Sequence, residues 1–201
     1  MWGIGLLPLG WARFVGVSAD TCANLIADGF TYPAFARFVP LARALFGAQS
    51  DEATELARIT AFFAAQPALD PLEEPLILAI HAALIDPATR TVRDLVEQVG
   101  AGQRRIERAS LRHFGFPPKL LLRRQRFMRT LAQYMLAGSA RWTDAIDEHY
   151  HDQPQFVRDC REFMGMTPRE YAAMPHPVLG PFMRERARVH GAAVQTLDRP
   201  D

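Results

Sequence analysis

The sequence predicts an all-α fold in which two helix-turn-helix subdomains are joined by a long helix. A small helical module with a short extended N-terminal segment precedes them. Apolar residues recur every three or four positions over most of the chain, the spacing of one face of an α-helix. Glycine and proline interrupt this pattern at short intervals, as they do at helix ends. Between residues 91 and 171 the order helix, turn, helix occurs twice, with a long basic helix between the two pairs.

Charge divides the 201 residues into parts of opposite sign. Residues 1–87 carry 4 arginines and no lysine against 9 acidic residues, a net charge of −5. Residues 88–174 carry 15 basic against 10 acidic residues, a net charge of +5, and residues 175–201 carry +1. We therefore predict a helical module at 1–87, a basic domain that faces a polyanion at 88–174, and a loose tail at 175–201.

The N-terminal segment Gly3–Val17 is apolar, but Pro8 and several glycines interrupt it. It falls far short of the roughly 20 apolar residues that cross a bilayer. It also has neither a basic leader nor a small-residue cleavage site. We expect either a strand remnant or an extended segment that packs on the rest of the chain, and we expect no membrane partner.

Four helices are predicted between residues 18 and 87, the first ending near Asp28 and the second covering Ala34–Phe46. The residues that cap or open them are Ser18, Pro33, Ser50 and Asp70. The side chains expected to face inward are Leu25, Ile26, Leu56, Ile59, Phe62, Phe63, Leu76, Ile77, Ile80 and Leu84. These apolar faces suit a small helical module or a dimer surface.

The first helix pair begins at Thr91, which has the spacing of a capping box with Asp94. Its apolar face contains Val92, Leu95, Val96 and Val99. The run Gly100-Ala101-Gly102 allows the sharp turn that follows. The second helix of the pair, Gln103–His113, has Ile106 inward and Gln103, Arg104, Arg105 and Arg108 outward.

The long helix is predicted at Lys119–Leu136 and carries Arg123, Arg124, Arg126 and Arg129 beside its apolar residues. The second pair begins with Trp142, Ala145 and Ile146. Asp152 caps its second helix, which has Pro154 near the start and Phe156, Cys160 and Phe163 on its inner face.

Residue types that read DNA bases stand in the first turn of the second helix of each pair. An arginine fork pairs with guanine, and glutamine pairs with adenine, in the major groove. The candidate base contacts are Gln103, Arg104, Arg105, Gln153 and Gln155. The candidates for phosphate contacts or structural ion pairs are Arg108, Lys119, Arg123, Arg124 and Arg158. For Lys119, Arg123 and Arg124 the alternative is a solvated helix face.

Other chemistry is not favoured. Two cysteines, Cys22 and Cys160, argue against a disulfide scaffold and fit a reducing cytoplasm, and Cys160 is expected in a core. His149, His151, Asp152 and Cys160 lack a zinc-site spacing, so no metal is expected. The sequence has no glycine-rich phosphate loop and no nucleophile motif, so we expect neither an enzyme nor a cofactor.

Four features form a specific signature: Gly115 with Pro118, Arg126, the run Tyr150-x-Asp-Gln-x-x-Phe156, and Gly165-x-Thr167-Pro168-x-x-Tyr171. With them, residues 86–173 resemble the AraC/XylS family of bacterial transcription regulators. The resemblance implies a seven-helix DNA-binding domain behind a sensor barrel and dimerisation helices. On that basis Gly3–Val17 corresponds to the last strand of the barrel and Ser18–Leu84 to the helices after it, and most of the barrel is expected to be missing.

The sequence departs from the family pattern at three places. Ser110 and Cys160 stand where each recognition helix usually has an aromatic residue, a gap that Leu111 or Phe114 is expected to fill in the first helix. The second turn, at His149, reads one residue short.

We predict a sequence-specific transcription regulator that inserts two recognition helices into successive major grooves of double-stranded DNA. Further expected partners are a second copy, through the N-terminal helices, and RNA polymerase. The expected location is the bacterial cytoplasm, at the nucleoid. The alternative is a truncated helical module for protein–protein interaction with weak or no DNA binding, which the three departures favour.

Overall fold

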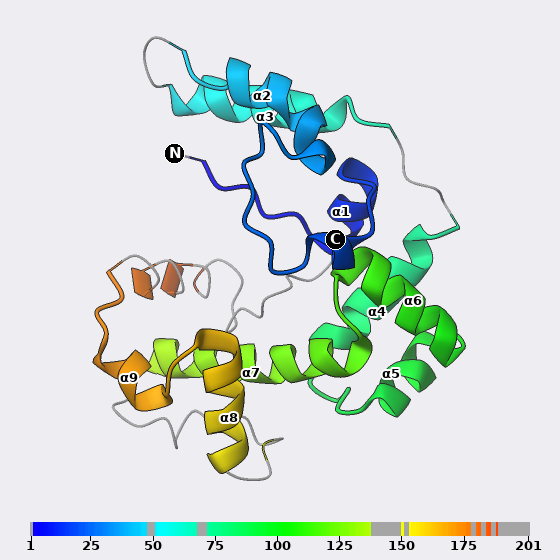
Figure 1. The fold of residues 1–201 in the computed structure, drawn as a ribbon, viewed down its shortest axis with the longest axis vertical. Coiled ribbons are helices and arrows are strands. Elements are labelled where there is room, and N and C mark those ends of the chain that lie inside the picture. Colours follow the sequence, from blue (N-terminus) through cyan, green and yellow to red (C-terminus); the bar gives the residue numbers. More distant parts are fainter. Residues whose placement is uncertain are drawn as a thin grey trace. The chain divides into compact units, whose positions relative to one another are not determined.

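The computed structural model describes residues 2–47, 51–67, 72–137, 150 and 153–177, together with 180, 181, 184, 185 and 188. Within these residues the chain is helical and contains no strand, which confirms the predicted all-α class (Figure 1). The α-helices are α1 (Pro8–Phe14), α2 (Val39–Ala44), α3 (Glu52–Ala64), α4 (Glu74–Ile85), α5 (Val92–Val99), α6 (Gln103–Phe114), α7 (Pro118–Ala137), α8 (Gln153–Met164) and α9 (Pro168–Ala173). Two short 3₁₀ helices are η1 (Ala19–Cys22) and η2 (Pro33–Phe38).

Several predicted features lie outside the described residues. They are the caps Ser50, Asp70 and Asp152, the start of the second pair at Trp142, Ala145 and Ile146, and the histidines His149 and His151. Packing divides the chain into two compact units, one of residues 1–78 with 104–116 and the other of 79–103 with 117–201.

In the first unit, the predicted strand remnant at Gly3–Val17 is wrong over most of its length, because Pro8–Phe14 forms α1. Pro8 is the first helical residue, where its fixed φ suits the helix and its missing N–H costs nothing. Within this segment, only the residues before Pro8 and after Phe14 lack helical structure. Aromatic contacts hold α1 in place, since the Phe14 and Phe63 ring centroids lie 4.7 Å apart.

The helix predicted from Ser18 to Asp28 is also wrong. Only the 3₁₀ turn η1 forms, because the Ser18 hydroxyl donates to the Asp20 carboxylate at 2.6 Å instead of capping a backbone N–H. Asn24 then takes a left-handed φ of 57°, which stops any continuation. Leu25 and Ile26, predicted to face inward, are exposed, and Ile26 is 100% exposed.

The helix predicted at Ala34–Phe46 forms as two pieces, η2 and then α2. Pro40, in the first turn of α2, has no backbone N–H, so a regular α-helical bond to residue 36 cannot form there. The tighter 3₁₀ geometry up to Phe38 accommodates this interruption.

The core of the N-terminal helices lies between α2 and α3, which pack against each other (Figure 1). Leu41, Leu45 and Ile59 form its buried centre, and the partly buried Phe62 and Phe63 extend it. Glu55 is buried beside them, where its carboxylate accepts a hydrogen bond from the Trp2 indole at 2.6 Å. Leu56 was predicted on this face but is 52% exposed.

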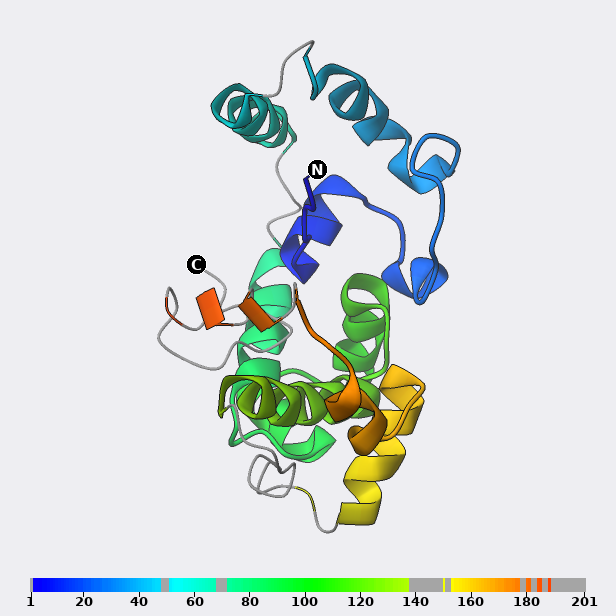
Figure 2. The ribbon, with the colours of Figure 1, turned by 90° about the vertical axis from the view of Figure 1, so that its left-hand side faces the viewer.

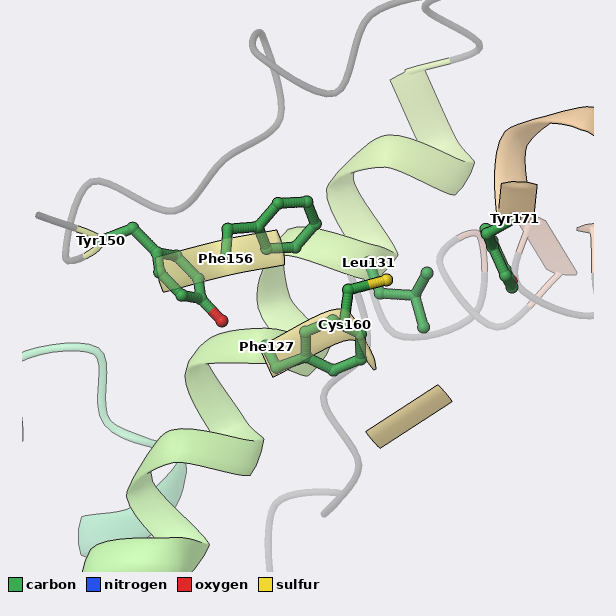
Figure 3. Packing of buried hydrophobic residues seen from close by; sticks show 6 residues of the cluster. All are labelled: Phe127, Leu131, Tyr150, Phe156, Cys160 and Tyr171. Carbon is green, nitrogen blue, oxygen red and sulfur yellow. The ribbon is translucent and has the colours of Figure 1, made fainter. Parts of the chain in front are cut away.

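In the second unit, α8 lies against α7, the longest helix of the described chain (Figure 2). Residues of α7, α8 and α9 share one apolar cluster (Figure 3). Helix α5 also contacts α7. These contacts position α8, the second helix on which base contacts are predicted.

Candidate nucleic-acid interface

Helix α5 begins and ends as its sequence predicts. The Thr91 hydroxyl accepts from the Asp94 N–H at 3.1 Å, and Asp94 accepts from the Thr91 N–H at 2.9 Å, which completes the capping box. The hydrogen bonds that the Asp94 carboxylate accepts from the Thr91 N–H, above all, and from the Arg90 N–H hold the pKa of Asp94 below its ordinary value. Gly100 ends the helix with a left-handed φ of 67° and leaves three residues before α6.

Helix α6 has one buried and one exposed face. Ile106, Ala109, Ser110 and His113 are buried. The exposed side chains are Gln103, Arg104, Arg105, Arg108, Leu111 and Arg112. With four arginines against Glu107, and neutral His113, the helix carries a net charge of +3. Three of its arginines, Arg104, Arg105 and Arg108, form no ion pair within the described residues. The predicted outward residues of this helix are therefore accessible to a polyanion.

Glu73, just before α4, neutralises the far end of α6. Its carboxylate lies 3.4 Å from the Arg112 guanidinium and 3.5 Å from the His113 imidazole. His113 is 5% exposed, and this burial lowers its pKa below 6.5, although Glu73 acts in the opposite direction. The cationic character of α6 is therefore concentrated in its first two turns.

Gly115 ends α6, and Ser110 lies on its buried face. Gly115 follows α6 with a left-handed φ of 80°. A side chain there would strain the backbone, and its Cβ would lie only 3.2 Å from the Ala19 carbonyl oxygen. Ser110 is completely buried, and its hydroxyl has no hydrogen-bond partner in the described part of the chain. Leu111, expected to fill the place of the missing aromatic, is exposed and does not do so, whereas Phe114 is half-buried.

Helix α8 shows a similar division into two faces. Phe156 and Cys160 are each 1% exposed, and Phe163 packs against the same cluster, as predicted. Gln153 and Arg158 are exposed, while Gln155 is half-buried. Burial raises the pKa of the Cys160 thiol to about 11, so this cysteine is an unreactive core residue.

Asp159 is the polar centre of the α7–α8 contact. It is 2% exposed and accepts hydrogen bonds from the Arg123 guanidinium at 2.6 Å, the Arg126 guanidinium at 3.3 Å and the Tyr150 hydroxyl at 3.0 Å. The Arg126 guanidinium also lies over the Tyr150 ring, 4.3 Å from its centroid. Burial and the Asp159 charge raise the pKa of Tyr150, so its hydroxyl stays protonated and donates.

The apolar cluster surrounds this ion-pair network on the same helices. Phe127 and Leu131 from α7 meet Phe156 and Cys160 from α8, with Tyr150 and Tyr171 at the sides (Figure 3). The Phe127 and Phe156 rings stack with centroids 5.9 Å apart. Large side chains buried in this way each contribute about 1.5–3 kcal/mol to folding. The contact therefore fixes α8 on α7, while Gln153, the first residue of α8, remains exposed.

The candidates on α7 differ in their surroundings. Lys119 is exposed. Arg123 is held by Asp159 and also by Glu162, at 2.8 Å, and these hydrogen bonds raise its pKa above its ordinary value. Arg124 is half-buried, and this burial lowers its pKa. Of the three, Lys119 is the cation most accessible to a phosphate.

Sequence reasoning missed Asp159 and the start of α9. The signal for Asp159 was a single acid within the apolar stripe Phe156, Cys160 and Phe163, where only a paired charge is stable. The signal for α9 was the spacing of Thr167 and Glu170, which form a second complete capping box. This box turns the chain so that Tyr171 reaches the cluster.

A family model described as a helix-turn-helix domain matches residues 95–174. This region is therefore similar to helix-turn-helix domains of the AraC type. The domain type is one that binds DNA in transcription regulators, and the match contains α6, α7, α8 and all ten candidate site residues. No curated protein and no solved structure matches the chain.

Two further observations concern the described residues alone. Among them no helix combines the length and the apolar character needed to cross a membrane. They also contain no cluster of three or more histidine, cysteine, aspartate or glutamate side chains that could hold a metal ion. His149, His151 and Asp152, considered as metal-ligand types in the sequence, lie outside this part of the chain.

Proposed function

We propose that this protein is a sequence-specific transcription regulator that inserts α6 and α8 into successive major grooves of double-stranded DNA. One observation carries the proposal: within the helix-turn-helix match, each of these helices buries one face and exposes glutamine or arginine side chains in its first turns. The first turns are the part of a recognition helix that contacts base edges.

On α6 we assign base contacts to Gln103, Arg104 and Arg105. Arginine donates two parallel hydrogen bonds to O6 and N7 of guanine, and glutamine bridges N6 and N7 of adenine. The net charge of +3 on this helix attracts it to DNA regardless of sequence. Arg108, a turn further along and exposed, is suited to a phosphate.

On α8 we assign base contacts to Gln153 and Gln155. This helix has no net charge, since two arginines balance Asp159 and Glu162, so its affinity for phosphates is lower than that of α6. Arg158 and Lys119 supply exposed cations for the DNA backbone. Arg123 positions α8 through Asp159, and Arg124, half-buried, stays a candidate phosphate contact.

The proposal also includes two protein partners, a second copy of the chain and RNA polymerase. Two recognition helices about 34 Å apart along the duplex read one asymmetric site without a partner subunit. A second copy, joined through the N-terminal helices, would read a second site, and contact with RNA polymerase would convert DNA binding into control of transcription. These activities place the protein at the bacterial nucleoid.

A second candidate function is a helical module for protein–protein interaction. Exposed apolar side chains in the first unit favour it, since Ile26 is 100%, Leu72 79%, Phe30 57% and Leu56 52% exposed. Exposed apolar groups of this size are frequent at interaction surfaces. The buried hydroxyl of Ser110 also weakens the inner face of α6.

The test is selection of duplexes from fragmented genomic DNA, followed by mobility-shift titration of a recovered site and a random duplex at several salt concentrations. A regulator retains a preference for the recovered site as salt rises, because base contacts depend less on salt than phosphate contacts do. The Arg104→Ala variant should lose about 1–3 kcal/mol of that preference. Equal loss on both duplexes would reassign Arg104 to a phosphate contact. Binding to neither duplex would favour the interaction module.

A further inference from the structure

One side of α6, from Arg105 to His113, and the start of α4 with the residues before it line a hollow of about 120 Å³ in the first unit. Leu72, Leu76 and Ile77 form one wall, and Ala109 adds to it from α6. Arg105, Arg108 and Arg112 stand around it at a spacing of three and four residues, so all three guanidinium groups lie on one side of the helix. The hollow thus has an apolar wall and a cationic rim.

The charges of this hollow do not balance. Glu73 is its one carboxylate, and it already pairs with Arg112 at 3.4 Å and with His113 at 3.5 Å. Arg105 and Arg108 have no ion pair in the described part of the chain. Three guanidinium groups around one carboxylate leave an excess positive charge that favours an anion.

The apolar wall limits which anion fits. Leu72 is 79% exposed, so a ligand body that covers it removes apolar surface from water. A dry cavity of about 150 Å³ holds a group the size of benzene. The hollow is slightly smaller, so it accepts an apolar body of roughly four to six carbons.

We propose that this hollow binds a short-chain carboxylate, whose charged end pairs with Arg105 and Arg108 and whose apolar end lies on Leu72 and Leu76. Guanidinium groups bind carboxylates through two parallel charge-assisted hydrogen bonds. The inference rests on the proposed function in one respect: Arg105 and Arg108 are also DNA-contact candidates. A carboxylate bound to them therefore competes with DNA, and the ligand acts as a release signal.

Binding is tested first without DNA, on the full chain, with hexanoate as the probe and 1-hexanol as the uncharged analogue. Calorimetric titration should give saturable hexanoate binding in about the millimolar range and much weaker binding of hexanol. Replacing both Arg105 and Arg108 with Ala should weaken hexanoate binding about tenfold or more. The control Arg43→Ala removes an exposed arginine of α2, outside the hollow, and should leave binding unchanged.

A substitution in the apolar wall of the hollow changes ligand binding without altering any DNA-contact candidate. Leu72→Asn should weaken hexanoate binding several-fold without altering affinity for DNA. In wild-type protein, hexanoate should release a bound duplex, and in Leu72→Asn it should do so only at higher concentration. Hexanoate binding that is absent, or equal in all variants, overturns the inference even where DNA is bound. If the protein binds hexanoate as described but binds no duplex, the proposed function fails and the ligand site stands.

Discussion

At the scale of single residues, Asp159 determines how α8 is held. Its carboxylate accepts hydrogen bonds from Arg123, Arg126 and Tyr150, and it is almost completely buried. A charge in this position is stable only because its partners surround it. The same groups hold α8 against α7, so the orientation of Gln153 and Gln155 depends on a residue that need not touch DNA.

Asp159→Ala should therefore lower the free energy of unfolding by about 3 kcal/mol, because it removes the buried carboxylate that the Arg123 and Arg126 guanidinium groups share. Urea denaturation followed by circular dichroism measures this change. The matched control is Glu162→Ala, which removes the other carboxylate bound to Arg123. Glu162 is 53% exposed, so its loss should cost less than about 1 kcal/mol. Equal effects of the two substitutions would contradict the role given to Asp159.

His113 predicts a dependence of stability on pH. Burial lowers its pKa in the folded protein below 6.5, so the unfolded chain binds a proton more readily than the folded one. The stability that neutral His113 contributes is complete above pH 6.5. It is lost as the pH falls through the lower pKa that His113 has in the folded protein. The neighbouring charges are Glu73, which opposes this shift, and Arg112, which adds to it.

The wild-type protein should lose more stability between pH 7.5 and 5.5 than the His113→Gln variant, whose side chain does not titrate. Denaturation at the two pH values gives the difference. An NMR titration of the His113 ring with a midpoint above 6.5 would reverse the expected sign.

At the scale of elements, helices with complete end signals formed where the sequence predicted them. Thr91 with Asp94 fixes the start of α5, and Gly100 fixes its end. The bounds of α6 and α7 also agree closely with the prediction, since Gly115 follows the end of α6 and Pro118 begins α7.

Thr91→Ala should cost about 1 kcal/mol of folding free energy, because it removes the acceptor for the Asp94 N–H. Thr91→Ser retains the hydroxyl and is the control, expected to change stability by only a few tenths of a kcal/mol. Urea denaturation of both variants measures these changes in folding free energy. Similar losses of stability in Thr91→Ala and Thr91→Ser would show that the hydroxyl is not what stabilises the start of α5.

The N-terminal elements were harder to predict for identifiable reasons. Ser18 has the residue type of a cap, but its hydroxyl binds the nearer Asp20 carboxylate, a competition that residue type alone does not reveal. Pro8 was a valid helix-start signal, yet the apolar, glycine-rich context obscured it. The prediction that Leu56 faces inward was wrong, because a helix with apolar residues on several sides does not specify which side packs against the core.

The candidate site was predictable in part. Residue type and position identified exposed groups such as Gln103, Arg104 and Gln153, because the inner faces of α6 and α8 are periodic. The ion-pair network around Asp159 joins residues 33 to 36 positions apart, a separation that no local pattern encodes. The base contacts of Gln103, Arg104 and Gln153 remain predictions.

At the scale of the whole molecule, residues 95–174 match a helix-turn-helix domain, and the helices that precede them have an acidic composition. The first compact unit contains α6 together with residues 1–78, whereas α7, α8 and α9 belong to the second.

The central claim is that α6 and α8 each contact DNA, in successive major grooves. Methylation-protection footprinting of wild-type protein, Gln103→Ala and Gln153→Ala on a selected duplex tests it most directly. We expect wild-type protection in two major-groove windows about one helical turn apart, with each variant losing protection in a different window. Protection of a single window, weakened by both variants or by neither, would contradict the account.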